Sequence, residues 1–212
     1  EVRAFADAEI ALVRTFADQA VIAIENARNF NDTREALEQQ TAIAEVLQTI
    51  SSSVADPAPV FDRILLACER LFGGDQLVVF LIDAGGERLK IGAIRGSDPE
   101  RVERMRRLFP IPLAGTATER VMRDQRLLTF ADVLHDPDVP LPVRRVAQMQ
   151  GEETYALALA PMLWEGKVIG SVMVGRRELR AFDDKEQRLL RTFADQAVIA
   201  IQNARLIEEA EQ

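Results

Sequence analysis

The stretch RTFADQAVIAIENAR, residues 14–28, returns near the other end of the chain as RTFADQAVIAIQNAR, residues 191–205. The two copies lie 177 residues apart and differ only where Glu25 is replaced by Gln202. Apolar residues recur in both at steps of three and four, which predicts two helices that each bury one face. A solenoid protein has at least three short repeats, so one partial copy at this long spacing does not indicate a solenoid.

The repeat predicts a domain organisation. We expect residues 1–30 to be the C-terminal helix of a preceding domain and residues 56–207 to be a complete domain of the same kind. Residues 31–55 would be a linker helix, and residues 208–212 the start of a downstream linker. The alternative is a duplicated coiled-coil segment without domain meaning. The match of Arg-Ala-Phe at 3–5 with Arg-Ala-Phe at 180–182 precedes the apolar stripe and favours two domains.

The linker is predicted to continue the first helix. No proline or glycine occurs from Glu1 to Ala55, so an unbroken helix is expected from about residue 8 to 54. Its second half carries a short heptad seam, which a parallel helix of a second chain could bury. The alternative is a helix that folds back on its own domain. The predicted dimer seam consists of Ala36, Gln40, Ile43, Leu47, Ile50 and Val54.

Composition excludes several classes of protein. The chain has 212 residues and a net charge of −8, so it lacks the basic footprint of a nucleic-acid-binding protein. One cysteine and one histidine allow neither an intrachain disulfide nor a zinc cluster. The first residues, Glu-Val-Arg-Ala, are not expected to form a signal peptide, and no apolar run is long enough for a membrane span. We therefore expect a cytoplasmic protein without a metal site or a membrane segment.

The middle of the chain is predicted to form strands linked by hairpins. Residues 77–82 are apolar on both faces, and residues 88–94 follow them after an Asp-Ala-Gly-Gly turn. These features predict an α+β fold, with an antiparallel five- to six-stranded sheet, helices packed on one face and a long N-terminal helix ahead of it. Further strands are expected at 127–133, 155–163 and 168–176, and helices at 60–72, 101–108, 116–124 and 144–148.

The strand 155–163 has two unlike faces. Tyr155, Leu157 and Leu159 alternate with small residues, of which Ala158 is one. We expect the leucine face to pack on the helices and the alanine face, with Met162, to form the floor of a pocket. The alternative for the alanine face is tight packing against a covering loop.

Three segments carry a resemblance to a known family. They are Ile-Pro-Leu-Ala-Gly at 111–115, Gly-Lys-Val-Ile-Gly-Ser-Val-Met-Val at 166–174, and the tail that begins Ala-Phe-Asp-Asp-Lys-Glu at 181–186. Together with the order of elements, they make residues 56–207 similar to a GAF domain of bacterial sensor proteins. The resemblance implies a small-molecule or redox-sensing domain, dimeric through its terminal helices. It also implies an output domain such as a histidine kinase or nucleotide cyclase.

The resemblance does not identify a cofactor. Gly-Arg-Arg at 175–177 stands where cyclic-nucleotide-binding members have an Asn-Lys pair, so cyclic nucleotide binding is unsupported. No segment matches the bilin-binding motif. His135 stands alone in a loop and reads as a turn residue rather than a haem ligand. Cys68 lies on an apolar helix face, and one cysteine cannot serve the reductases of free methionine sulfoxide that share the fold.

These observations predict a non-catalytic sensory domain that binds an unidentified small molecule. The alternatives are a ligand-free dimerisation and transmission module and, more weakly, an enzyme that shares the fold. No residues form a catalytic nucleophile motif. The candidate ligand-binding residues are Thr116, Thr118, Asp132, His135, Arg144, Tyr155, Ala158 and Met162.

Overall fold

The computed structural model describes residues 5–52, 56–149 and 154–210. The chain forms two units, residues 1–42 and residues 43–212, and each is described by itself. The first unit is the greater part of helix α1, Asp7–Ser52. The second contains all the other elements in the order of an α+β domain.

Helix α1 confirms the long N-terminal helix. It runs without a break for 46 residues. Of the predicted dimer seam, Ala36 and Gln40 are exposed and Ile43 is half-buried. The side chains of Leu47 and Ile50, and Val54 as a whole, lie outside the described residues, so the pairing of this seam with a second chain stays a prediction.

The sheet has six strands in the order β3-β2-β1-β6-β5-β4, and every neighbouring pair is antiparallel. This confirms the predicted sheet. Irregularities in register occur between Val79 and Phe80 and between Met162 and Leu163. The strands are β1 (Gln76–Ile82), β2 (Arg88–Gly96), β3 (Ile111–Pro112), β4 (Leu128–Phe130), β5 (Ala156–Trp164) and β6 (Lys167–Arg176).

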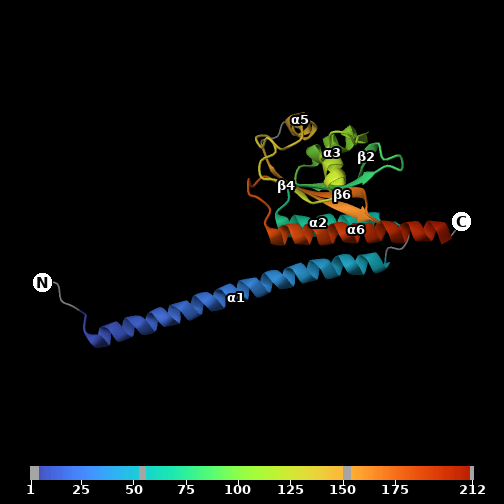
Figure 1. Ribbon diagram of the computed structural model, residues 1–212. Coiled ribbons are helices and arrows are strands. Elements are labelled where there is room, and N and C mark those ends of the chain that lie inside the picture. Colours follow the sequence, from blue (N-terminus) through green and yellow to red (C-terminus); the bar gives the residue numbers. More distant parts are fainter. Residues whose placement is uncertain (1–4, 53–55, 150–153, 211–212) are drawn as a thin grey trace. The chain divides into compact units, whose positions relative to one another are not determined.

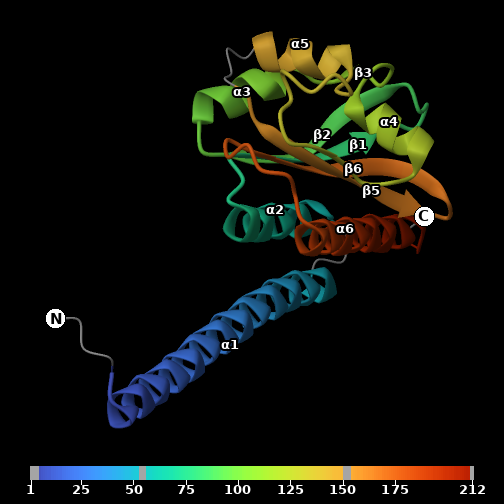
Figure 2. The same cartoon turned by 60° about the vertical axis from the view of Figure 1, so that its left-hand side comes forward.

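One face of the sheet is covered by helices α2 (Ala58–Phe72) and α6 (Asp184–Ala210), as Figures 1 and 2 show. Helix α2 ends at Gly73, whose φ of 61° is the left-handed conformation that glycine adopts at helix ends. Phe61, Ile64 and Phe193 are fully or almost fully buried on this side. The edge-to-face contact of Phe72 with Phe193, 6.5 Å between ring centroids, joins the two helices.

The opposite face carries three short helices, α3 (Pro99–Leu108), α4 (Ala117–Asp124) and α5 (Leu141–Met149), with the loops between them (Figure 2). The start of α4 is fixed by Thr116, whose hydroxyl accepts a hydrogen bond from the amide of Glu119. Asp98 caps α3 in the same way through the amides of Glu100 and Arg101. A second hydrophobic cluster fills the space between these helices and the sheet.

Candidate functional site

A cavity of about 80 Å³ lies between the sheet and helices α3–α5. Strands β1, β2, β5 and β6 supply its floor, and α3, α4 and α5 supply its roof. The lining is mostly apolar with a few polar groups, which is the composition of sites where proteins bind small molecules. The lining consists of Phe80, Leu89, Met105, Phe109, Ile111, Thr116, Ala117, Thr118, Pro142, Val143, Val146, Tyr155, Leu157, Leu159 and Met173.

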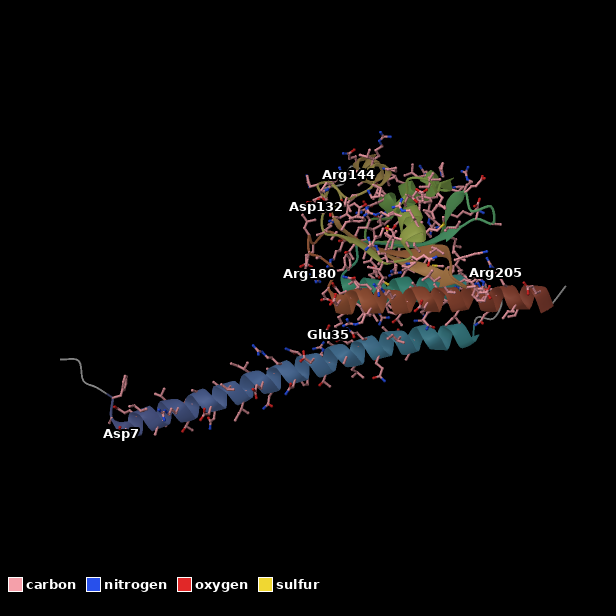
Figure 3. The ribbon with its side chains drawn as sticks, in the orientation of Figure 1. Asp7, Glu35, Asp132, Arg144, Arg180 and Arg205 are labelled. Atoms are coloured by element: carbon pink, nitrogen blue, oxygen red, sulfur yellow. The ribbon has the colours of Figure 1, made fainter. Side chains whose placement is uncertain are left out.

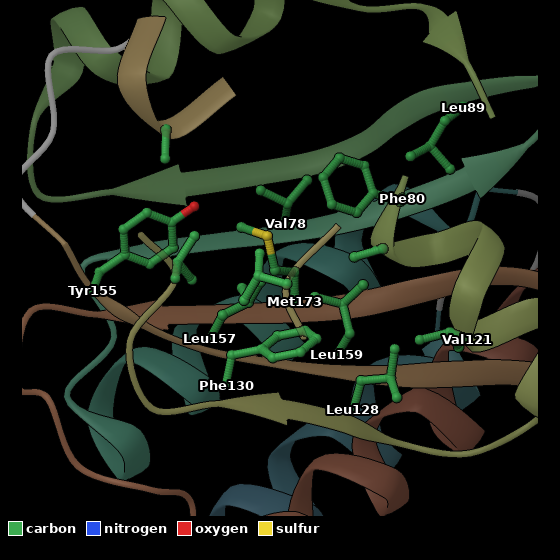
Figure 4. Packing of buried hydrophobic residues seen from close by; sticks show 14 of the residues in the cluster. Val78, Phe80, Leu89, Val121, Leu128, Phe130, Tyr155, Leu157, Leu159 and Met173 are labelled. Atoms are coloured by element: carbon green, nitrogen blue, oxygen red, sulfur yellow. The ribbon is translucent and has the colours of Figure 1, made fainter. Parts of the chain in front are cut away.

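The large side chains of β5 form the floor of this cavity. Figure 4 shows Tyr155, Leu157 and Leu159 on one face of the sheet together with Met173 and Phe80. The expectation that the leucine face packs on the long helices was therefore wrong. Sequence alternation was read correctly, but it does not tell which of two apolar faces the long helices cover.

The small side chains of β5 point the other way. Ala156, Ala158 and Ala160 are fully buried on the face that α6 covers, because they alternate with the cavity-lining leucines. Met162 follows the same alternation and is also absent from the lining. Ala158 and Met162 are therefore corrected from cavity floor to helix-packing positions.

The two threonine hydroxyls of the cavity are already paired within the protein. Thr118 and Ser171, both buried, bring their hydroxyl oxygens to 3.0 Å. Thr116 donates its hydroxyl proton to the carbonyl of Leu113 over 2.7 Å, besides accepting from Glu119. A buried hydroxyl that has a partner does not require one from a ligand.

Tyr155 is the third polar residue of the lining. The Arg101 guanidinium carbon lies 5.9 Å from the centre of the Tyr155 ring, within the range of a cation–π contact. Arg101 also donates from Nη2 to Oε1 of Gln76 over 2.8 Å. The tyrosine ring therefore has a cation beside it that does not itself line the cavity.

The roof is closed by contact between the start of α4 and α5. Gly115 has a φ of +78°, and a Cβ built on it would stand 2.9 Å from Cγ of Pro142. A larger residue at this position would therefore be strained and would push α5 away from the cavity. Beside it, the rings of Phe80 and Phe109 stack with centroids 5.3 Å apart.

Asp132 and His135 form a separate cluster outside the cavity. The Asp132 carboxylate accepts from the His135 amide over 3.0 Å and from the Thr154 hydroxyl, and lies 2.9 Å from Nδ1 of His135. The bond from Thr154, together with those from His135, outweighs partial burial and lowers the pKa of Asp132 below its ordinary value. His135 is exposed, which agrees with its interpretation as a turn residue.

Arg144 is also absent from the cavity lining, although its neighbour Val143 lines it. Its Nη2 donates to the carbonyl of Asp136, so it ties α5 to the preceding loop. Figure 3 shows Arg144 and Asp132 on the loop side of the domain, away from α6. Of the eight predicted site residues, the structure brings Thr116, Thr118 and Tyr155 together at the cavity and places the other five elsewhere.

A buried arginine joins β6 to the start of α6. Arg176 is 2% exposed and donates from Nη1 to Oε1 of Glu186 over 2.7 Å. Its Nη2 donates to the carbonyls of Arg180 and Ala181, and its guanidinium carbon lies 3.9 Å from the centre of the Phe182 ring. Because Met173 of the same strand lines the cavity, β6 connects the cavity with α6.

The described residues hold no group of three histidine, cysteine, aspartate or glutamate side chains that could bind a metal ion. Cys68 is buried in α2, and its burial raises the pKa of the thiol far above the ordinary value. Among the described helices, none is both long enough and apolar enough to cross a bilayer.

Most of the cavity-lining residues were not among the predicted site residues. They are apolar side chains such as Met105, Val146 and Met173, which in the sequence look like any core residue. The alternation of β5 was the one usable signal, because it groups Tyr155, Leu157 and Leu159 on a single face. Assigning that face to the cavity required the position of α6.

The six-stranded antiparallel sheet, with two helices on one face and a cavity under short helices on the other, defines the class of a small α+β domain. The chain belongs to the GAF domain family, whose model matches residues 56–201.

Individual relatives agree with this assignment. The formate hydrogenlyase transcriptional activator of Escherichia coli is 30% identical over 97 residues, which cover 45% of this chain and only 14% of that protein. The GAF domain of a phosphoenolpyruvate-protein phosphotransferase from Coxiella burnetii has a TM-score of 0.66 at 15% identity, with 82% of this chain and 98% of that one covered.

The same fold also occurs in an enzyme. Free methionine-R-sulfoxide reductase from Neisseria meningitidis, solved with its substrate, has a TM-score of 0.63 at 15% identity. The match covers 82% of this chain and 93% of the reductase chain. At this identity the likeness shows the fold alone.

Proposed function

We propose that this chain is a sensory domain of a multidomain signal-transduction protein of the cytoplasm, that it binds a small molecule in the cavity and that it transmits binding through its terminal helices. The cavity under α3–α5 is the observation that carries this proposal. Membership of the GAF family and the match to part of a transcriptional activator support a regulatory role. An output domain such as a histidine kinase or nucleotide cyclase would lie in the longer protein.

The lining indicates the chemical class of the ligand. Among the described residues it contains no charged side chain, and the hydroxyls of Thr116 and Thr118 are engaged within the protein. An anionic or strongly polar ligand would lose its hydration without gaining partners. The ligand proposed is therefore compact, uncharged and largely apolar.

The proposed relay runs along β6. A molecule that displaces Met173 would move the strand whose end holds Arg176, and Arg176 binds the carbonyls of Arg180 and Ala181 just before α6. Figure 3 shows Arg180 just before the start of α6 and Arg205 near its far end, and the proposed relay would move the helix between them. A ligand shifts such an equilibrium only by its difference in affinity for the two states.

The cavity volume supports a second candidate function. A volume of about 80 Å³ is small for a metabolite, and the hydroxyls of Thr116 and Thr118 have hydrogen-bond partners without a ligand. A ligand-free module that dimerises and transmits a signal from a neighbouring domain would have these properties. It differs from the sensor in retaining no small molecule.

Native mass spectrometry of the purified chain separates the two candidates. The sensor predicts a bound mass that organic solvent releases, and an absorption spectrum shows whether it is a chromophore. Leu159→Phe should abolish the bound mass because the larger ring fills the cavity, whereas Leu163→Phe on the same strand, at an exposed position, should retain it. A chain that carries no bound mass after gentle purification contradicts ligand retention and favours the ligand-free module.

Dimerisation through the heptad seam is a further part of this proposal. Ile43 and Leu47 lie three and seven residues after Gln40, at seam positions of the predicted coiled coil. Replacing both by aspartate should halve the molar mass measured by light scattering. Thr41→Asp, on the exposed side of α1, is the matched control and should leave the mass unchanged. A dimer that survives the double replacement contradicts the seam.

A non-catalytic role is supported by Cys68. The thiol is fully buried in α2, on the side of the sheet opposite the cavity, and its raised pKa leaves almost no thiolate. A buried thiol in this state cannot act as the nucleophile of a sulfoxide reductase.

A further inference from the structure

The two copies of the repeat begin their helices in the same way. Helix α1 starts at Asp7 and α6 at Asp184, which are equivalent positions of the repeat. The amide of Ala6 donates to Oε2 of Glu9 over 2.7 Å, and the amide of Asp183 donates to Oε2 of Glu186 over 2.9 Å. The two copies therefore share not only their sequence but also the hydrogen bond from a backbone amide to a glutamate side chain at the N-terminus of the helix.

In the second copy, the repeat is the core-facing part of a folded domain. Phe193 is fully buried and packs against Phe72 of α2, and α6 also packs on β5. Its buried residues cover a broad arc of the helix, since they include neighbouring pairs as well as residues one turn apart. The buried positions are Phe182, just before the helix, and Leu189, Leu190, Phe193, Ala194, Ala197, Val198, Ala200, Ile201 and Ala204 within it.

In the first copy, the equivalent residues are exposed. Phe16 is 62% exposed although its counterpart Phe193 is 0% exposed. Phe5 is 75% exposed, and its counterpart Phe182 is 3% exposed. We define the apolar face of α1 as Phe5, just before the helix, with Leu12, Val13, Phe16, Ala17, Ala20, Val21, Ala23, Ile24 and Ala27, all of them exposed.

An apolar face of this extent on a solvated helix marks an interaction surface. A two-helix coiled coil would bury a narrow seam with two positions in every seven. The apolar face of α1 is broader, because it contains the adjacent pairs 16–17, 20–21 and 23–24. The apolar face of α1 has the same width as the buried face of α6. The buried face of α6 packs on a surface made of helix α2 and the sheet.

We propose that the apolar face of α1 is the docking surface for a module of the same kind as residues 56–177, and that it covers the α2 and β5 surface of that module as α6 does in this domain. The side chains that would make the contact differ from those of α6 only where Val13 replaces Leu190. The inference is independent of ligand binding in the cavity.

The test supplies such a module. Residues 56–177 are placed as an extra copy directly before Glu1 of the intact chain, so that Glu1 follows residue 177 as Glu178 does in the natural sequence. Hydrogen exchange of residues 12–27 is measured in the chain with and without the extra copy. We expect exchange of these amides to slow in the fused chain to the rate of residues 189–204 and to remain faster in the unfused chain.

Matched variants identify the face. In the fused chain, Phe16→Asp should unfold the added module and leave the original one folded. Ile22→Asp should leave both folded, because its counterpart Ile199 is exposed in α6. A second fusion, in which the added copy keeps residues 178–205 of its own, shows whether this copy folds in that position.

The proposal is overturned if residues 12–27 exchange at the same rate with and without the extra copy. Slow exchange in both chains would mean that a second copy of the chain covers the face. Fast exchange in both would mean that the module does not recognise it. Equal effects of Phe16→Asp and Ile22→Asp would also overturn the assignment of the face.

Discussion

Arg176 at the end of β6 and Glu186 in the first turn of α6 form a buried ion pair with Nη1 2.7 Å from Oε1. The same carboxylate accepts from Arg180 over 2.8 Å. The pair therefore fixes the entry of the chain into α6, the helix that completes the domain.

Replacing Glu186 by alanine should lower the free energy of unfolding by about 3 kcal/mol, because Arg176 would remain buried without its counter-ion. Urea unfolding monitored by circular dichroism measures this loss. Glu178→Ala removes an exposed partner of Arg180 and should change stability by less than about 0.5 kcal/mol. Equal losses in the two variants would contradict the importance of the buried pair.

The same carboxylate predicts a dependence of stability on pH. Burial of Glu186 favours its neutral form, but hydrogen bonds from Arg176 and Arg180 outweigh burial and hold the pKa below its ordinary value of 4.5. In acid the unfolded chain therefore binds this proton first. The stabilisation is present above pH 4.5 and is lost as the pH falls through the lower pKa of the folded state.

Glu186→Gln isolates this contribution from those of other carboxylates, such as Asp83, whose pKa is also lowered. The free energy of unfolding of the variant should fall less steeply between pH 5 and pH 3, a range that brackets the ordinary glutamate value. Parallel pH profiles for the variant and the natural protein would show that Glu186 does not titrate as described.

The hydroxyl pair of Thr118 and Ser171 predicts a non-additive pair of substitutions. Thr118→Val or Ser171→Ala alone leaves one buried hydroxyl without its partner, at a cost of about 1–3 kcal/mol. The double variant should cost less than the sum of the two, because neither hydroxyl remains. A double-mutant cycle by urea unfolding measures the coupling, and strict additivity would contradict the hydrogen bond.

The cavity floor predicts the effect of removing a large side chain. Leu157→Ala should destabilise the domain by about 2–5 kcal/mol, because it enlarges a cavity that is lined by apolar side chains. Leu163→Ala, on the same strand but exposed, should cost less than about 1 kcal/mol. Comparable losses would mean that Leu157 is not part of the packed floor.

Much of the fold could be predicted from the sequence, because its signals are local. Strands and helices are specified by patterns of neighbouring residues. Examples are the alternation of β5, the glycine after Phe72 and the absence of proline and glycine before Ala55. The helix at 144–148 was predicted too short: α5 begins at Leu141, since Pro142 is compatible with a first turn.

The site could be predicted only in part. Thr116, Thr118 and Tyr155 were found because polar groups near a helix start and an aromatic ring in a strand are visible in the sequence. Asp132, His135 and Arg144 were chosen for their chemistry, but Asp132 binds His135 and Thr154, and Arg144 binds the loop before α5. Which sheet face meets the cavity depends on contacts between α6 and β5, distant in sequence, that no local pattern contains.

The alanines of β5 determine how the domain responds to a displacement. Ala156, Ala158 and Ala160 meet a helix that is itself lined by Ala194, Ala197 and Ala200 at buried positions. The methyl groups of these alanines have no rotamers, so at these positions no side chain can take up a movement by changing its conformation. We therefore expect the spacing between the backbones of β5 and α6 to change little at these alanines, so that a shift of β5 moves α6 with it.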